Sequence, residues 1–404
     1  MILPAGVAPD ARLLLLARGL RATVDGYVAI LLPAYLLALG FGTWEVGLLG
    51  TATLLGSAAA TLALGAWGHR YPARGLLFAA AALMAATGLG FALLGQPAAF
   101  WPLLLVAFVG TMNPSAGDVS VFLPLEHARL AESADGDART TLFARYSLTG
   151  SLCAALGALL AGVPGWLTAN AGLGELDALR AMFLLYGAVG VLLWAIYRRL
   201  PAPAAHGLAT APAPLGPSRA TVVRLAALFS LDAFAGGLVV NALLALWLFE
   251  RFDLSLAAAG RFFFWAGLLT AFSQLAAPVV ARRIGLLNTM VFTHIPANLC
   301  LMLAALAPNL PWALGLLLAR AALSQMDVPT RSAFVMAVVT PAERAAAASF
   351  TNVPRSLAAA ISPAIGGALF AAGWMAVPLL ACGGLKIAYD LAIWRAFRKV
   401  TPGA

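Results

Sequence analysis

Long apolar segments, separated by short polar links, follow one another along nearly the whole chain. A membrane-spanning helix needs about 20 mainly apolar residues. Twelve segments meet this requirement, and they cover residues 13–38, 44–66, 75–95, 99–123, 141–163, 179–197, 221–248, 256–280, 286–307, 311–338, 344–371 and 375–396. The pattern therefore predicts an all-α membrane protein with twelve transmembrane helices.

The link after the sixth segment is longer than the others and is rich in Pro and Ala. We therefore divide the chain into an N-terminal six-helix bundle (1–197), a linker (198–220) and a C-terminal six-helix bundle (221–404). The two halves are also related in sequence.

Three pairs of segments carry this relation in the same order: LRATVDG (20–26) with LFSLDAF (228–234), MNPSAGDVSVFLPLEH (112–127) with MDVPTRSAFVMAVVTP (326–341), and GSLCAALGALLAG (150–162) with RSLAAAISPAIGG (355–367). Repeats of six helices with a site at their interface are a known plan of transporters.

Composition excludes the soluble classes. Hydrophobic residues make up 62% of the chain and charged residues 10%, whereas soluble domains carry about 25% charged residues. The net charge is +9, but the basic residues are spread over short links, so we expect no nucleic-acid partner. Cys153, Cys300 and Cys382 lie far apart in apolar segments. We therefore expect them to be packing residues and predict no metal and no cofactor.

The basic residues predict the orientation of the chain. If both termini are cytoplasmic, the inner links hold most of the Arg and Lys residues, and the outer links hold only Arg180, Arg251 and Arg261. This asymmetry satisfies the positive-inside rule. We therefore expect a multi-pass protein of the cell inner (plasma) membrane with a cytoplasmic linker. We expect it to work as a monomer in the lipid bilayer.

The link after the second segment resembles the signature G-x-x-x-D-R-x-G-R-R of the major facilitator superfamily. Gly65, Arg70 and Arg74 match it, while His69 replaces the acid and Pro72 replaces the second Gly. Together with twelve spans and a long central link, this resemblance implies two bundles related by pseudo-twofold symmetry. It also implies a central cavity lined by spans one, four, seven and ten. Because the family's acid forms part of a latch between conformations, His69 puts that latch in doubt.

Span ten carries an unusual polar stripe. Arg320, Ser324, Asp327 and Arg331 lie at i, i+4, i+7 and i+11, which is one face of a helix. Charged groups inside a membrane normally face a bundle interior or a water-filled path. We therefore expect this face to form a wall of the cavity, with Asp327 and Arg331 spaced to pair.

Two acids near the middle of spans one and seven are candidates for carrying a coupled proton. Asp25 has Arg21 one turn away, so it is either that residue's structural partner or a proton carrier. Asp232 has no basic residue one turn away on its own helix, so desolvation is expected to favour its neutral form. Lys386 and Asp390 lie one turn apart in span twelve and are expected to be a structural pair, and His294 is given no metal role.

The remaining candidates are polar residues within or beside the spans. The candidates for the substrate cavity are Arg21, Tyr27, Asn113, Gln274, Arg320, Ser324, Asp327, Arg331, Asn352 and Arg355. The candidates for a cytoplasmic gate are Arg70, Arg74, Asp118, Glu126 and Arg145.

No phosphate-binding loop and no nucleophile–base arrangement is found, so we expect no enzyme. The expected function is secondary active transport by alternating access, as proton-coupled export of a small organic solute or drug. Transport of an organic anion, by uptake or exchange, is an alternative that Arg21, Arg320, Arg331 and Arg355 favour. An uncoupled facilitator is another alternative.

The predicted orientation can be tested with single cysteines in a cysteine-free background. An impermeant thiol reagent applied outside intact cells should label Gly95→Cys in an outer link. It should spare Ala205→Cys in the linker, because the basic asymmetry places that link inside. Labelling of Ala205→Cys with protection of Gly95→Cys would reverse the predicted topology.

Overall fold

A computed structural model describes residue 8 and residues 10–94, 100–115, 120–133, 136–201, 216–340 and 343–399. These residues form helices joined by short links, with no strand among them. Helices of this length satisfy their backbone hydrogen bonds internally, which hydrocarbon surroundings require. The all-α fold predicted from the apolar segments is therefore confirmed.

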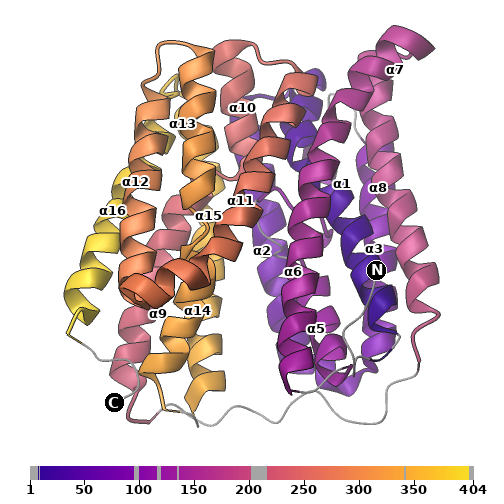
Figure 1. The fold of residues 1–404 in the computed structure, drawn as a ribbon. Helices are drawn as coiled ribbons and strands as arrows, with labels where there is room; N and C mark the ends of the chain where they lie inside the picture. Colours follow the sequence, from indigo (N-terminus) through magenta and orange to yellow (C-terminus); the bar gives the residue numbers. More distant parts are fainter. Residues whose placement is uncertain are drawn as a thin grey trace.

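The helices separate into two groups by their position in the chain, and Figure 1 shows the two groups beside each other. The first group contains α1 (Ala11–Ala38), α2 (Thr43–Trp67), η1 (Gly68–Arg70), α3 (Ala73–Leu94), α4 (Phe100–Val109), α5 (Phe122–Glu132), α6 (Gly136–Ala158), η2 (Leu159–Gly162), α7 (Val163–Ala171) and α8 (Glu175–Tyr197). The second group contains α9 (Arg219–Gly237), α10 (Asn241–Phe252), α11 (Leu256–Ile284), α12 (Leu286–Ala305), α13 (Leu310–Leu323), α14 (Asp327–Val338), α15 (Arg344–Ala371) and α16 (Val377–Phe397). The predicted division at the linker, of which residues 202–215 lie outside the described residues, stays a prediction.

Three of the twelve predicted spans are not continuous helices, and one of them, 221–248, is divided between α9 and α10 at residues 238–240. Among the described residues, ten helical segments are long and apolar enough to cross a membrane. The predicted span 99–123 is divided between α4 and α5, and the predicted span 311–338 is divided between α13 and α14. The expectation of one unbroken helix in each place was therefore wrong.

Proline lies at the breaks in the predicted spans 99–123 and 311–338. Pro114 follows Asn113 in the first interruption and disfavours helical backbone at that residue. Pro329 lies in the first turn of α14 and has no N–H to donate to the carbonyl of Gln325. The apolar pattern continues through both positions, so hydrophobicity alone did not reveal them.

The two groups of helices meet through small residues on α2 and α15. A Cβ atom added to Gly47 would lie 2.5 Å from the carbonyl oxygen of Pro363, and one added to Gly367 would lie 2.7 Å from the carbonyl oxygen of Thr43. Nearby, the Oγ1 atom of Thr51 accepts a hydrogen bond of 2.9 Å from the amide of Ala364. Such close approach of two backbones is possible only where side chains are absent or very small.

A second contact of the same kind joins α6 to α11. A Cβ atom on Gly260 would lie 2.6 Å from the carbonyl oxygen of Ala158, and one on Gly267 would lie 2.9 Å from the Cβ atom of Ala155. Both contacts lie near helix ends, since Gly47 and Gly260 follow the starts of α2 and α11 whereas Gly367 and Ala158 lie near the ends of α15 and α6. By contrast, residues 59–67 of α2, nearer the termini, are exposed or half-buried. The two halves therefore close against each other at the end opposite the termini.

At the other end, Glu343 ties the start of α9 to the connection before α15. Its carboxylate accepts hydrogen bonds from the amide of Gly216, from the amide of Ser218 at 3.3 Å and from the hydroxyl of Thr340 at 2.6 Å. Hydrogen bonds from Ser218 and Thr340 lower the pKa of Glu343 to about 2. The carboxylate therefore stays ionised at any physiological pH and anchors the first residues of the second half.

The backbones of α2 and α15 meet at Gly47. We therefore predict that adding one methyl group at this position pushes the two halves apart. In Gly47→Ala the new Cβ atom meets backbone, and overpacking of this kind costs about 1–3 kcal/mol. Spin labels on Leu173→Cys and Trp374→Cys, both exposed positions in different halves, should report a longer distance between the halves.

The matched control is Gly65→Ala, since no atom lies within 4 Å of a Cβ at that position. It should leave the distance distribution unchanged. An unchanged distribution in Gly47→Ala as well would contradict the assignment of this contact as a closing surface.

Candidate functional site

A network of buried charges joins three helices of the second half. Asp232 on α9 is 3% exposed. Its Oδ2 atom lies 3.0 Å from Nη1 of Arg331 on α14, and its Oδ1 atom lies 2.5 Å from Nζ of Lys386 on α16. The same Nη1 atom of Arg331 lies 3.2 Å from Oδ2 of Asp327, which confirms the pair expected from their i, i+4 spacing. We call Asp232, Asp327, Arg331 and Lys386 the charged cluster.

The charged cluster corrects the expectation that Asp232 has no cation to stabilise its ionised form. The spacing argument considered only residues on the same helix, whereas both cations come from other helices. It also corrects the expected Lys386–Asp390 pair. Lys386 contacts Asp232, and Asp390 instead contacts His294 on α12, with 3.0 Å between Oδ1 and Nδ1. Whether Asp232 carries a coupled proton stays a prediction, and its carboxylate is held in two ion pairs.

The polar stripe of span ten is not one continuous helical face. Arg320 lies near the end of α13, and Ser324 follows this helix and donates its amide to the carbonyl of Arg320 at 2.9 Å. Asp327 and Arg331 lie beyond the break, on α14. The break at residues 324–326 therefore separates Arg320 from the other two charges.

Two arginines of the second half have no acid beside them. Among the described residues, no carboxylate oxygen lies within 4.0 Å of the side-chain nitrogens of Arg320 or Arg355. Arg320 is half-buried. Arg355 on α15 is also half-buried and lies within electrostatic reach of the charged cluster. Both are therefore cations that the described part of this half does not neutralise.

The first half contains a second buried network, centred on Arg21 and Glu126. Arg21 on α1 is 1% exposed. Its guanidinium donates to Glu126 at 2.7 Å, to Ser120 at 2.7 Å and to Tyr146 at 3.2 Å. The hydroxyls of Tyr146 and Tyr197 both donate to the Glu126 carboxylate, the latter at 2.7 Å. Arg21 and Glu126 thus join α1, α5, α6 and α8.

This network changes the roles expected for several residues. Arg21 was expected to line the cavity and Glu126 to form a gate, but the structure buries both inside the first half as partners of each other. Tyr27, another cavity candidate, is 0% exposed and donates its hydroxyl to the carbonyl of Met182 at 2.9 Å. The structure therefore does not place these three side chains on a cavity wall. Sequence spacing missed the pair because its members lie 105 positions apart.

Asn113 lies where the interrupted span of the first half meets the second half. Its Oδ1 atom accepts hydrogen bonds from the amide and hydroxyl of Ser115, at 3.0 and 2.7 Å. The carbonyl of the next residue, Pro114, accepts a hydrogen bond of 3.1 Å from the amide of Ala242, in the first turn of α10. The break between α4 and α5 therefore contacts the start of α10, directly after the break between α9 and α10.

The other candidates are distributed over both halves. Asp25, Arg145 and Gln274 are half-buried, on α1, α6 and α11, whereas Asn352 on α15 is exposed. Arg74 donates to the carbonyl of Arg198, and Arg70 is exposed. Asp118 lies outside the described residues. No described contact brings the gate candidates together as one group.

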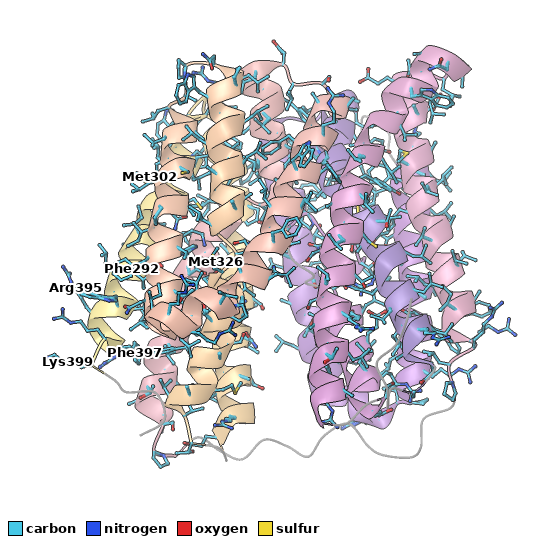
Figure 2. The ribbon with its side chains drawn as sticks, viewed as in Figure 1. Phe292, Met302, Met326, Arg395, Phe397 and Lys399 are labelled. Carbon is cyan, nitrogen blue, oxygen red and sulfur yellow. The ribbon has the colours of Figure 1, made fainter. Side chains whose placement is uncertain are left out.

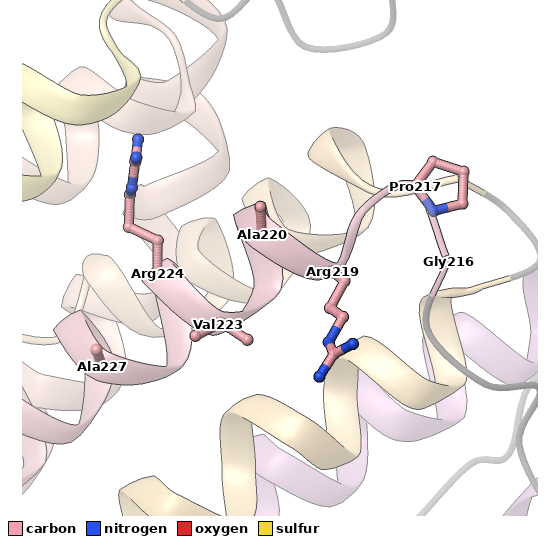
Figure 3. Close-up of a pocket in the computed structure, with 7 residues that line it drawn as sticks. All are labelled: Gly216, Pro217, Arg219, Ala220, Val223, Arg224 and Ala227. Carbon is pink, nitrogen blue, oxygen red and sulfur yellow. The ribbon is translucent and has the colours of Figure 1, made fainter.

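A groove with a volume of about 690 Å³ lies at the start of α9, in a separate place. Arg219 and Arg224 project from α9 there in different directions (Figure 3). None of the cavity candidates lines this groove. Other basic side chains, Arg395 and Lys399, project outward near the end of α16 (Figure 2). These residues lie at the same end of the molecule as the chain termini, and the central site has to be sought elsewhere.

Sequence reasoning missed two contributors, Lys386 as the partner of Asp232 and His294 as the partner of Asp390. One signal could have found them. Each is a titratable residue in an apolar span, and such a residue needs a polar partner because hydrocarbon does not solvate it. That signal indicates that a partner exists without saying on which helix it lies.

Comparison with known proteins agrees with this architecture. The family model described as Major Facilitator Superfamily matches residues 14–324. A curated relative is the uncharacterized membrane protein YJR124C of Saccharomyces cerevisiae, which is 24% identical over 419 residues, covering 95% of this chain and 93% of the relative.

Solved structures of several transporters share the fold. The nucleoside transporter NupG is 17% identical with a TM-score of 0.73, covering 97% of this chain and 100% of that one. The xylose transporter XylE from E. coli is 14% identical with a TM-score of 0.74, covering 95% and 96%. The human organic anion transporter MFSD10 is 20% identical with a TM-score of 0.64, covering 95% and 99%. At these identities the likeness is one of fold.

The charged cluster predicts a specific pattern of stability changes. Lys386→Met should destabilise the protein by about 3–5 kcal/mol, because removing one partner leaves a buried charge less well compensated. Adding Asp232→Asn should recover part of this loss. Thermal unfolding in detergent measures both effects, with the exposed Lys399→Met as the control. If the losses in the double variant simply add, the two residues do not act as a pair in the folded protein.

Proposed function

The chain belongs to the Major Facilitator Superfamily, and on that premise we propose that it is a secondary transporter of a small organic anion, working by alternating access. Membership makes it a multi-pass membrane protein of a transporter family. The anionic charge of the cargo is our inference from the charges of the second half.

The observation that carries the proposal is the surplus of positive charge around the charged cluster. Asp232 and Asp327 are shared between Arg331 and Lys386, and Asp390 is paired with His294. Arg320 and Arg355 remain, each without a carboxylate within 4.0 Å among the described residues. An ion within a membrane span is costly unless something compensates its charge. An anionic cargo supplies that compensation while it is bound.

Arginine is suited to this role. Its guanidinium offers five N–H donors in a fixed planar fork, which matches a carboxylate or phosphate and offers no acceptor to a cationic ligand. Of the two unneutralised arginines, Arg355 has the more suitable position. It lies on α15, whose far end packs against α2 of the first half and which therefore has to move when the halves separate. The exposed Asn352 lies one turn away on the same helix.

Proton-coupled export of a neutral or cationic drug has less support. That function was expected to use an acid without a cation beside it, and Asp232 is held by two. Asp25 stays the alternative candidate for carrying a coupled proton. The named substrates of the structural neighbours differ, from nucleosides and xylose to organic anions, so the shared fold alone favours none of them. The direction of transport stays open in the proposal.

A thermal-shift experiment on the purified protein tests the charge of the cargo. Benzoate, benzamide and benzylamine have similar size and differ in charge. We expect benzoate to raise the unfolding temperature in a saturable way, and the other two compounds to have no such effect. In Arg355→Gln the apparent affinity for benzoate should fall at least tenfold, which corresponds to about 1.4 kcal/mol.

The matched control is Arg395→Gln, at an exposed position on α16, which should bind benzoate like the wild type. The same compounds are then applied to proteoliposomes that contain a pH-sensitive dye, where a solute-stimulated pH change reports coupled transport. Stabilisation by benzylamine that Arg355→Gln leaves unchanged would overturn the anion proposal.

A further inference from the structure

A buried histidine–aspartate pair lies beside the charged cluster, in a place that the transport proposal does not use. Nδ1 of His294 on α12 lies 3.0 Å from Oδ1 of Asp390 on α16. The two residues are 4% and 1% exposed. The other carboxylate oxygen of Asp390, Oδ2, is buried and has no hydrogen-bond partner among the described residues. The pair can therefore bind a further proton at an atom that the His294–Asp390 hydrogen bond does not use.

Charged and titratable groups surround this pair on the helices of the second half. Lys386 lies one turn before Asp390 on α16, and Tyr389 is its neighbour, with a buried hydroxyl that lacks a described partner. Asp232 on α9 lies within electrostatic reach of both His294 and Asp390. Beyond Asp232 lie Asp327 and Arg331 on α14 and Arg355 on α15. A change of charge on the pair therefore acts on Asp232 and Lys386, two members of the charged cluster.

We propose that His294 and Asp390 form a proton-binding site that sets the charge of the cluster and so controls its affinity for anionic cargo. In the form without the extra proton, neutral His294 donates its Nδ1 hydrogen to the Asp390 carboxylate. A proton taken from the aqueous phase is bound either at Nε2 of His294 or at the free carboxylate oxygen. Both outcomes raise the charge of the pair by one, and no other bond forms or breaks.

The physical basis is that the pair lies within electrostatic reach of Asp232, and Asp232 within reach of Arg355, in a medium of low dielectric constant. Charges interact strongly there because little water screens them. An added positive charge beside the cluster favours an anion at Arg355 and opposes the departure of that anion. Histidine is suited to the switching role because its ordinary titration range lies around neutral pH. Binding of the proton therefore raises the affinity for the anion, and binding of the anion raises the affinity for the proton. This coupling rests on the proposed anion transport.

The opposing hypothesis is that the pair only packs α12 against α16. Its hydrogen bond would then keep one protonation state over the whole physiological range. The two hypotheses differ in one measurable quantity, the protonation of the His294–Asp390 pair as a function of pH, which the imidazole of His294 reports because its Nδ1 contacts the carboxylate.

Histidine-specific isotope labelling measures this quantity directly, because the chain has only 4 His residues. The protein with His69→Gln, His127→Gln and His206→Gln retains His294 alone, and its imidazole gives a single NMR signal in detergent. We expect this signal to titrate between pH 5 and pH 8. In Asp390→Asn the midpoint should change by about one pH unit, the usual scale of a close charge interaction. A signal that does not change between pH 5 and pH 8 would overturn the proposal.

The link to cargo is tested separately with benzoate, which remains anionic over the range used. In wild type the dissociation constant for benzoate should fall at least threefold between pH 8 and pH 6, and in His294→Gln it should not change with pH. His127→Gln, in the other half, should behave like the wild type. Equal pH dependence in His294→Gln and wild type would overturn the coupling. If benzoate fails to bind at any pH, the anion proposal fails instead, while the NMR titration still decides whether the site binds a proton.

Discussion

The structure depends on one constraint: charged side chains within apolar spans need partners, because hydrocarbon does not solvate them. Each half meets this constraint with its own buried network. In the first half, Arg21 and Glu126 neutralise each other, and two tyrosines and a serine take up further hydrogen-bonding positions. In the second half, Asp232 is shared by Arg331 and Lys386. Each network joins helices that are distant in sequence, so the same contacts that neutralise charge also hold each bundle together.

The two networks are not equivalent, although the halves are related in sequence. The described hydrogen bonds of the first network join Arg21 and Glu126 to hydroxyl groups. In the second half, Arg320 and Arg355 have no carboxylate within 4.0 Å among the described residues. Under the proposed anion transport, these two arginines make the second half the one that interacts with the charged ligand. The proton site proposed at His294 and Asp390 lies in the half that carries the surplus.

Sequence patterns predicted this structure where the determining contact was local. The apolar segments predicted the helices, and the i, i+4 spacing of Asp327 and Arg331 predicted their ion pair. Patterns failed where the contact joins distant elements, as between Arg21 and Glu126 or between Lys386 and Asp232. They also failed at Pro114 and Pro329, because hydrophobicity continues through both breaks. Much of the candidate site depends on contacts between helices. The spacing of residues along one helix does not indicate which residues of another helix they contact.

The hydrogen bond from the amide of Ala242 to the carbonyl of Pro114 has a consequence for the evolution of this chain. Both of its atoms belong to the main chain, so every substitution at Ala242 except proline preserves the donor. Position 114 keeps its acceptor whatever residue occupies it. The hydrogen bond itself therefore requires no particular side chain at either position, and what restricts them is the burial of Ala242 and the break at Pro114. A comparison of relatives by residue identity would find no trace of the junction, and its persistence would be visible only in their backbones.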